Sequence, residues 1–297
     1  MKRFDILVIA ALAATLSACR HDVEFDACGQ IDAEQVTVSA EAAGRIISLD
    51  LKEGDALVAG QMVGAVDSVQ TALQISELEQ RRDGARSRLI DIAAQQAPQK
   101  QQLASLENDY RRFSALLKSD AATQKQVDDI SSQIDILKSQ IAAQKQTWER
   151  NNSSVQSEIS TYEIQLAQKR DQLAKCRICS PVSGTVLTKY ANEGESVTVG
   201  KPLFKLANLS DIYVRAYFTT SQLASLKLGD TLTVIPDDGS ANPKEYSGRL
   251  IWISSQAEFT PKNIQTRDER ADLVYAVKVS VPNDGSIRLG MYAYVRK

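Results

Sequence analysis

The sequence has almost none of the histidine on which much hydrolytic and zinc chemistry depends. Its 297 residues include one histidine, His21, close to the N-terminus. A Ser-His-Asp triad or a histidine-rich zinc site therefore cannot be assembled in the body of the chain. The phosphate-binding pattern G-x-x-x-x-G-K-(S/T) is also missing. We expect a protein that is not an enzyme and that holds neither a cofactor nor a metal.

An excess of positive charge is missing as well. The 35 lysines and arginines nearly balance the 37 aspartates and glutamates, which leaves a formal net charge of -2. No overall positive field therefore attracts a phosphate backbone, and we expect no nucleic-acid partner.

The chain lacks an apolar run long enough to span a bilayer, but its N-terminus resembles a lipoprotein signal. A basic start, M-K-R, is followed by an apolar run over Ile6–Leu16, which is too short for a transmembrane helix. The letters L-S-A-C that end at Cys19 resemble the lipobox of bacterial lipoproteins. We therefore expect removal of residues 1–18 as a signal peptide and lipidation of Cys19.

Such an anchor predicts a periplasmic protein held at a membrane by lipid, with residues 19–35 as an anchor segment and a first strand. Ordinary secretory cleavage near the same place is the alternative. Arg20 stands where the inner-membrane retention signal of enteric bacteria has aspartate. The sequence therefore leaves both the inner and the outer membrane open.

Cysteine is scarce, with three residues besides Cys19: Cys28, Cys176 and Cys179. In an oxidising compartment these allow one disulfide, between Cys28 and either of the other two. The C-x-x-C spacing of Cys176 and Cys179 is also found in redox sites. However, the letters C-R-I-C-S-P-V predict the start of a strand, on which residues three apart point to opposite faces and lie too far apart to bridge.

Glycine and proline are nearly missing from residues 69–175, where only Gly84 and Pro98 occur. Such a stretch is expected to be helical. Apolar residues recur there at heptad spacing, which favours a coiled coil. They are Leu78, Ala85, Leu89, Ile92, Leu103, Leu106, Tyr110, Phe113 and Leu117 in a first arm, and Val127, Ile130, Ile134, Leu137, Ile141, Ile159, Tyr162, Leu166 and Leu173 in a second.

Two helical arms joined by a short connection over residues 119–123 predict an antiparallel hairpin. Arms of about fifty residues give a rod about 75 Å long. We expect Pro98 to kink or break the first arm, because its ring and its missing N–H disrupt a helix. The heptad phase of the second arm slips near residues 151–155.

One glycine pattern occurs on each side of the predicted hairpin. Its flanking letters agree, with E-G-D-A-L-V-A-G in the first copy and E-G-E-S-V-T-V-G in the second. Each copy predicts short strands around tight turns, and neither is large enough to bury a core alone. We therefore expect residues 36–68 and 176–208 to form one small sandwich. Its turn glycines are Gly44, Gly54, Gly60, Gly184, Gly194 and Gly200.

The split repeat resembles the two halves of a biotinyl-lipoyl domain. With the inserted hairpin, it resembles the HlyD family of periplasmic adaptors, also called membrane fusion proteins. The resemblance implies an elongated α+β fold, in which a long antiparallel coiled-coil hairpin is inserted into a split lipoyl-like β-sandwich and a small β-barrel follows. In carrier domains a modified lysine lies between the halves, where this chain has its rod. We therefore expect Lys52 and Lys189 to be ordinary solvated strand residues.

Residues 209–297 contain short alternating stretches separated by glycine turns, which predicts a small β-barrel. The run over Leu209–Gly229 resembles the family's barrel entry, and Ala257–Arg270 resembles the branch that serves ABC-type exporters. The latter loop is alternatively a plain solvated connection. Its candidate transporter-facing residues are Phe259, Pro261, Lys262 and Arg270. The chain ends soon after Gly290, so we expect a membrane-proximal domain to be small or absent.

The tip of the predicted rod resembles that of adaptors that dock on a TolC-type channel. Their arginine, leucine and hydroxyl residue correspond to Arg112, Leu116 and Thr123, with threonine in place of serine. Arginine can fork onto carboxylates or carbonyls, and leucine supplies apolar contact. The alternative is a purely structural tip, in which Leu116 packs, Arg112 is solvated and Thr123 caps a helix.

The resemblance implies an adaptor that joins an inner-membrane exporter, of ABC type by the loop over residues 257–270, to a TolC-type outer-membrane channel. It further implies a ring of six copies around a conduit. A structural lipoprotein that only spaces membranes, and a lipoyl or biotin carrier, are the alternatives.

Overall fold

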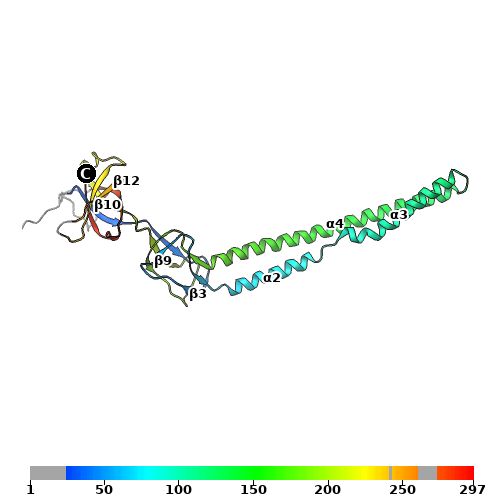
Figure 1. Cartoon of the computed structure of the whole chain (residues 1–297), viewed down its shortest axis with the longest axis horizontal. Helices are drawn as coiled ribbons and strands as arrows, with labels where there is room; N and C mark the ends of the chain where they lie inside the picture. Colours follow the sequence, from blue (N-terminus) through cyan, green and yellow to red (C-terminus); the bar gives the residue numbers. More distant parts are fainter. Residues whose placement is uncertain (1–24, 241–242, 260–272) are drawn as a thin grey trace, which may run out of the picture.

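The computed structural model describes residues 25–240, 243–259 and 273–297. A β-barrel, a β-sandwich and a long helical hairpin follow one another along the molecule, with the hairpin at the end opposite the barrel (Figure 1). The predicted fold class is confirmed.

Six strands form a closed barrel, in the order β1-β10-β13-β12-β11-β14. They are β1 (Ala27–Asp32), β10 (Asp211–Thr219), β11 (Thr231–Pro236), β12 (Tyr246–Phe259), β13 (Leu273–Pro282) and β14 (Tyr292–Arg296). A short helix, α5 (Thr220–Leu223), follows β10. The sequence had placed the barrel within residues 209–297, but β1 belongs to it as well, because β1 pairs with both β10 and β14.

The barrel core follows from strict alternation along its strands. On β10, Ile212, Val214, Ala216 and Phe218 are buried, while the residues between them are half-buried on the outer wall. Successive side chains of a strand point to opposite faces, so this period of two places every second residue inside. The outer wall is therefore free to carry polar and aromatic side chains.

The sandwich has two four-stranded sheets, β2-β9-β7-β4 and β6-β5-β3-β8. The first half supplies β2 (Gln35–Ser39), β3 (Gly44–Leu49), β4 (Ala56–Leu57) and β5 (Met62–Val66). The second half supplies β6 (Arg177–Cys179), β7 (Gly184–Lys189), β8 (Ser196–Val197) and β9 (Pro202–Ala207). Each sheet takes two strands from each half, so both halves are needed to cover one core that includes Ile46, Val186 and Phe204.

Three helices form the hairpin: α2 (Val69–Arg86), α3 (Ile92–Leu117) and α4 (Gln124–Lys175). At 1.5 Å per residue, the 52 residues of α4 span about 78 Å, close to the predicted length. The outgoing arm is interrupted at residues 87–91, whereas we had expected the interruption at Pro98. Pro98 lies inside α3, which begins at Ile92 behind an Asp91 cap and continues through the proline.

The interruption between α2 and α3 is held by the returning helix. The side chain of Asn152 accepts a hydrogen bond from the Ile90 N–H at 2.9 Å and donates one to the Ile90 carbonyl at 2.8 Å. Both backbone groups lack helical partners, and Asn152 satisfies them. This contact lies within the stretch of α4 where the heptad phase slips.

Within the described residues, no helix combines the length and the apolar character needed to cross a membrane.

Candidate functional site

The hairpin tip presents Arg112 and Leu116 on one side of α3. They lie four residues apart, which places them on the same helix face. The Arg112 side chain is 66% exposed and pairs with Asp109 at 2.8 Å, and its guanidinium lies 5.4 Å from the centre of the Phe113 ring. Leu116 is 38% exposed. The tip therefore offers a cation beside an apolar side chain in reach of a partner.

Thr123 begins the returning helix. Its hydroxyl accepts a hydrogen bond from the Gln126 N–H at 3.4 Å, and the Gln126 side chain accepts one from the Thr123 N–H at 2.9 Å. This capping box satisfies two N–H groups at the start of α4. The capping role predicted for Thr123 is thus confirmed, and its part in docking stays a prediction.

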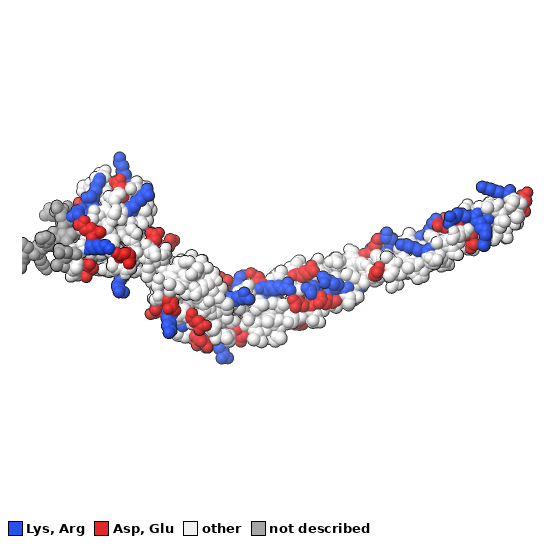
Figure 2. Space-filling view, in the orientation of Figure 1, with Lys and Arg blue, Asp and Glu red and all other residues white. Residues whose placement is uncertain are grey.

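Basic side chains gather near the tip of the rod, where Arg111, Arg112 and Lys118 are exposed (Figure 2). Acidic side chains accompany them there, including Asp109 and Asp120. The tip is therefore a mixed surface, without a strong field of one sign.

The predicted turn glycines lie at the junctions between the two sandwich halves. The Gly54 N–H donates to the Val186 carbonyl at 2.8 Å, and in the repeat-related contact the Gly194 N–H donates to the Ile46 carbonyl at 2.9 Å. Both glycines have a positive φ, of 95° and 86°. Only glycine adopts this conformation without strain. The turn glycine of each half therefore forms a backbone hydrogen bond to the other half.

The next pair of glycines also forms backbone hydrogen bonds between the two halves. The Gly60 N–H donates to the Ser180 carbonyl at 2.7 Å, and the Gly200 N–H donates to the Ala40 carbonyl at 2.8 Å. The remaining two glycines allow close packing: a Cβ on Gly184 would lie 2.7 Å from the Ala207 carbonyl oxygen. On Gly44, a Cβ would lie 2.8 Å from a methyl group of Val66.

The two lysines considered for cofactor attachment lie in the sandwich, away from the point where a carrier lysine would stand. The Lys189 ammonium donates to the carbonyl oxygens of Leu49 and Leu51, both at 3.1 Å. Lys52 lies in a turn, and its backbone N–H donates a hydrogen bond to the Asp55 carboxylate. The hairpin occupies the carrier position, and the carrier alternative is not favoured.

The three described cysteines lie in two different domains. No disulfide joins Cys28, Cys176 and Cys179. Cys28 belongs to the barrel strand β1, whereas Cys176 follows α4 at the base of the sandwich, so the disulfide that the sequence allowed for Cys28 does not form with Cys176 or Cys179. Cys176 is buried. Burial is the main cause that raises the pKa of its thiol, and the nearby negative charge of Asp67 raises it further. Cys179 is exposed at the end of β6.

The predicted transporter-facing loop is described only at its start. Phe259 ends β12 with 78% of its surface exposed, and it pairs across the ladder with Leu273, which is 52% exposed. Pro261, Lys262 and Arg270 lie outside the described residues, as does the predicted lipid anchor Cys19.

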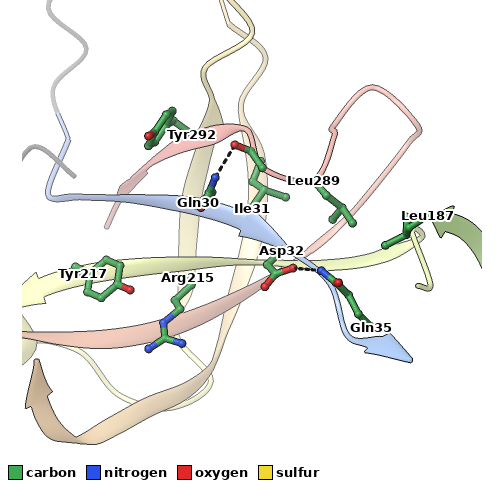
Figure 3. Close-up of a pocket in the computed structure, with 10 residues that line it drawn as sticks. Gln30, Ile31, Asp32, Gln35, Leu187, Arg215, Tyr217, Leu289 and Tyr292 are labelled. Atoms are coloured by element: carbon green, nitrogen blue, oxygen red, sulfur yellow. Dashed lines mark hydrogen bonds between the residues drawn. The ribbon is translucent and has the colours of Figure 1, made fainter. Parts of the chain in front are cut away.

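Sequence reasoning missed a pocket of about 550 Å³ where the barrel meets the sandwich (Figure 3). Barrel strands supply most of its lining, and the sandwich supplies Gln35 and Leu187. The lining residues are Gln30, Ile31, Asp32, Gln35, Leu187, Arg215, Tyr217, Leu289, Gly290 and Tyr292. No short sequence pattern predicts this pocket, because its walls come from strands that lie about 180 residues apart in the chain.

Two curated relatives resemble nearly the whole chain. A UPF0194 membrane protein of Citrobacter koseri is 29% identical over 96% of this chain and 94% of its own length. The UPF0194 membrane protein YbhG of Salmonella paratyphi B is 28% identical over 98% of this chain and 95% of its own length.

Solved structures share the fold. MacA from Actinobacillus actinomycetemcomitans superposes with a TM-score of 0.58 at 19% identity, covering 91% of this chain and 76% of MacA. A membrane fusion protein from Streptococcus pneumoniae gives a TM-score of 0.56 at 14% identity, covering 91% of this chain and 96% of its own.

The family assignment comes from the sandwich and its inserted hairpin. The family model described as the barrel-sandwich hybrid domain of RND membrane fusion proteins matches residues 34–208, which is more than half of the chain. The matched residues span both interlocked sandwich halves and the hairpin between them. The chain therefore belongs to the membrane fusion proteins, the non-enzymatic periplasmic adaptors of the HlyD type.

Proposed function

We propose that this chain is the adaptor of a tripartite efflux system, joining an ABC-type exporter in the inner membrane to a TolC-type channel in the outer membrane. The observation that carries the proposal is the exposed pair Arg112 and Leu116 at the far end of a rod about 78 Å long. A core needs no such rod, whereas a bridge across the periplasm does.

At the other end of the molecule, the barrel faces the exporter. The first barrel strand begins at Ala27, eight residues after Cys19. Eight extended residues reach at most about 28 Å, so a lipid on Cys19 would hold the barrel close to its membrane. The exposed Phe259 and Leu273 supply apolar contact for the exporter.

Several copies are needed to enclose a conduit, and we propose the ring of six that the family resemblance implies. The walls would be the rods and the stacked sandwich and barrel domains. The partner would hydrolyse ATP, because no phosphate-binding loop occurs in this sequence.

The channel contact is tested by reversing one charge at the tip. Arg112→Asp should lower recovery of the channel in pull-downs from cells by at least tenfold, because a charged contact at an interface is replaced by a repulsive one. Arg111→Asp is the matched control. It makes the same charge change one position away, on a different side of the helix, and should change recovery by less than twofold.

Equal recovery with both variants would refute the tip assignment. A plain spacer without an export partner predicts that no channel is recovered even with the unaltered chain. Deleting the protein should also sensitise cells to at least one exported compound, which a spacer would not do.

A further inference from the structure

The pocket between barrel and sandwich lies on the outer wall of the barrel. Strand register places Tyr292, Gln30 and Arg215 side by side on β14, β1 and β10. Asp32 follows Gln30 on the same face of β1, because it lies two residues further along the strand. Figure 3 shows Tyr217 and Tyr292 toward one end of this face and Leu187 toward the other. A polar band therefore crosses the pocket between an aromatic end and an aliphatic end.

The cation of this band is already ion-paired, and its carboxylate accepts hydrogen bonds from neutral groups. One nitrogen of the Arg215 guanidinium donates to both carboxylate oxygens of Glu258, at 2.9 and 3.1 Å. The Asp32 carboxylate accepts hydrogen bonds from the Ala33 N–H at 2.8 Å and from the Gln35 side chain at 3.0 Å. An anionic ligand would meet no unpaired cation among the described lining residues and would face the Asp32 carboxylate, so the pocket disfavours anions. A ligand whose hydroxyl or amide groups can donate to that carboxylate fits better.

Hydrogen-bonding capacity is nevertheless left over. The amide nitrogen of Gln30 donates to the Gly290 carbonyl at 2.9 Å, and that of Gln35 donates to Asp32. Among the described residues, none donates to the side-chain oxygens of Gln30 and Gln35, and none bonds to the Tyr292 hydroxyl. A purely apolar ligand would strip these groups of water without replacing its hydrogen bonds, which costs free energy.

We propose that this pocket binds a neutral carbohydrate. A sugar ring carries hydroxyls around its rim and C–H groups on its faces. The rim would bond to the amide oxygens of Gln30 and Gln35 and to the Tyr292 hydroxyl, and a C–H face would lie on an aromatic ring. Tyr292 is 42% exposed and offers such a surface. The volume of about 550 Å³ lies in the usual range of ligand pockets and accommodates two or three sugar rings.

The probes are two neutral sugars from different sources: the trimer of N-acetylglucosamine, which represents cell-wall glycan, and maltotriose, which represents storage or exported glucan. Each is titrated into the full mature chain by calorimetry. We expect saturable binding of at least one of them, and Gln35→Ala and Tyr292→Ala should each weaken it at least tenfold. One variant comes from the sandwich and the other from the barrel, so a folding defect in one leaves the other informative.

Gln256→Ala is the matched control, because Gln256 is an exposed glutamine of the same barrel outside the pocket. It should leave the affinity within twofold, and so should Arg112→Asp, which separates this site from the proposed channel contact. Absence of binding for both sugars would overturn the proposal, as would binding that neither pocket variant weakens. Preference for one trimer would identify the source of the sugar.

Discussion

At the scale of single residues, two cysteines three positions apart have opposite environments. Burial raises the pKa of the Cys176 thiol, so this thiol stays protonated at pH values where an ordinary one begins to ionise. The thiolate is the reactive form. At pH 8 we therefore expect a maleimide to label the exposed Cys179 at least tenfold faster than Cys176, as followed by peptide mass spectrometry.

The pH dependence gives a second check on this prediction. Because the pKa is raised, labelling of Cys176 should keep increasing with pH above the ordinary range of a thiol. In urea that unfolds the chain, the two rates should converge, because burial is lost. Similar rates in the folded protein would contradict the assigned burial of Cys176.

At the scale of elements, the joint between α2 and α3 depends on one side chain of α4. Asn152→Ala removes both hydrogen bonds to Ile90 and leaves two partly buried backbone groups without them. We expect a loss of about 1–3 kcal/mol in local stability. Hydrogen exchange of peptides that contain Ile90 should rise correspondingly, while exchange in the barrel should stay the same.

Asn151→Ala provides the control for the joint. Asn151 is exposed and makes no side-chain hydrogen bond with another described residue. Its substitution should leave exchange near Ile90 unchanged. An equal effect of both variants would mean that helix propensity, rather than the hydrogen bonds between Asn152 and Ile90, determines the local stability of the joint.

At the scale of the whole molecule, the hairpin is an insertion whose two ends meet. The Val66 N–H donates to the Cys176 carbonyl at 2.8 Å, so a short link can join the sandwich halves directly. Replacing residues 69–175 with a four-residue Gly-Ser linker should leave the sandwich and the barrel folded. Small-angle scattering should show a molecule shorter by about 75 Å, and circular dichroism should show loss of the helical signal alone.

The sandwich itself should not tolerate the loss of either half. Deleting residues 35–68 removes two strands from each sheet, and the turn glycines of the remaining half lose their partners. We expect an unfolded or aggregated sandwich in that variant. If the linker variant also unfolded, the hairpin would be part of the sandwich core and not an insertion.

The residues that the sequence predicted well are those with local requirements. The glycine spacing identified both sandwich halves, since a positive φ at Gly54 and Gly194 depends on the turn itself. The interruption at residues 87–91 was missed, because Leu89 and Ile92 continue the heptad pattern through it. The side chain that bonds to it, Asn152, lies 62 positions from Ile90, so no local pattern marks the contact.

The sequence alone determined the helical rod, the paired sandwich halves and the strand content of the barrel. Periodicity and turn chemistry act over a few residues, so they can be read along the chain. Only the tertiary structure decided that β1 closes the barrel, that Cys28 lies in the barrel whereas Cys176 and Cys179 lie in the sandwich, and that Gln30, Arg215 and Tyr292 share one pocket wall. These features depend on which distant strands pair, and pairing is chosen by burial over the whole chain.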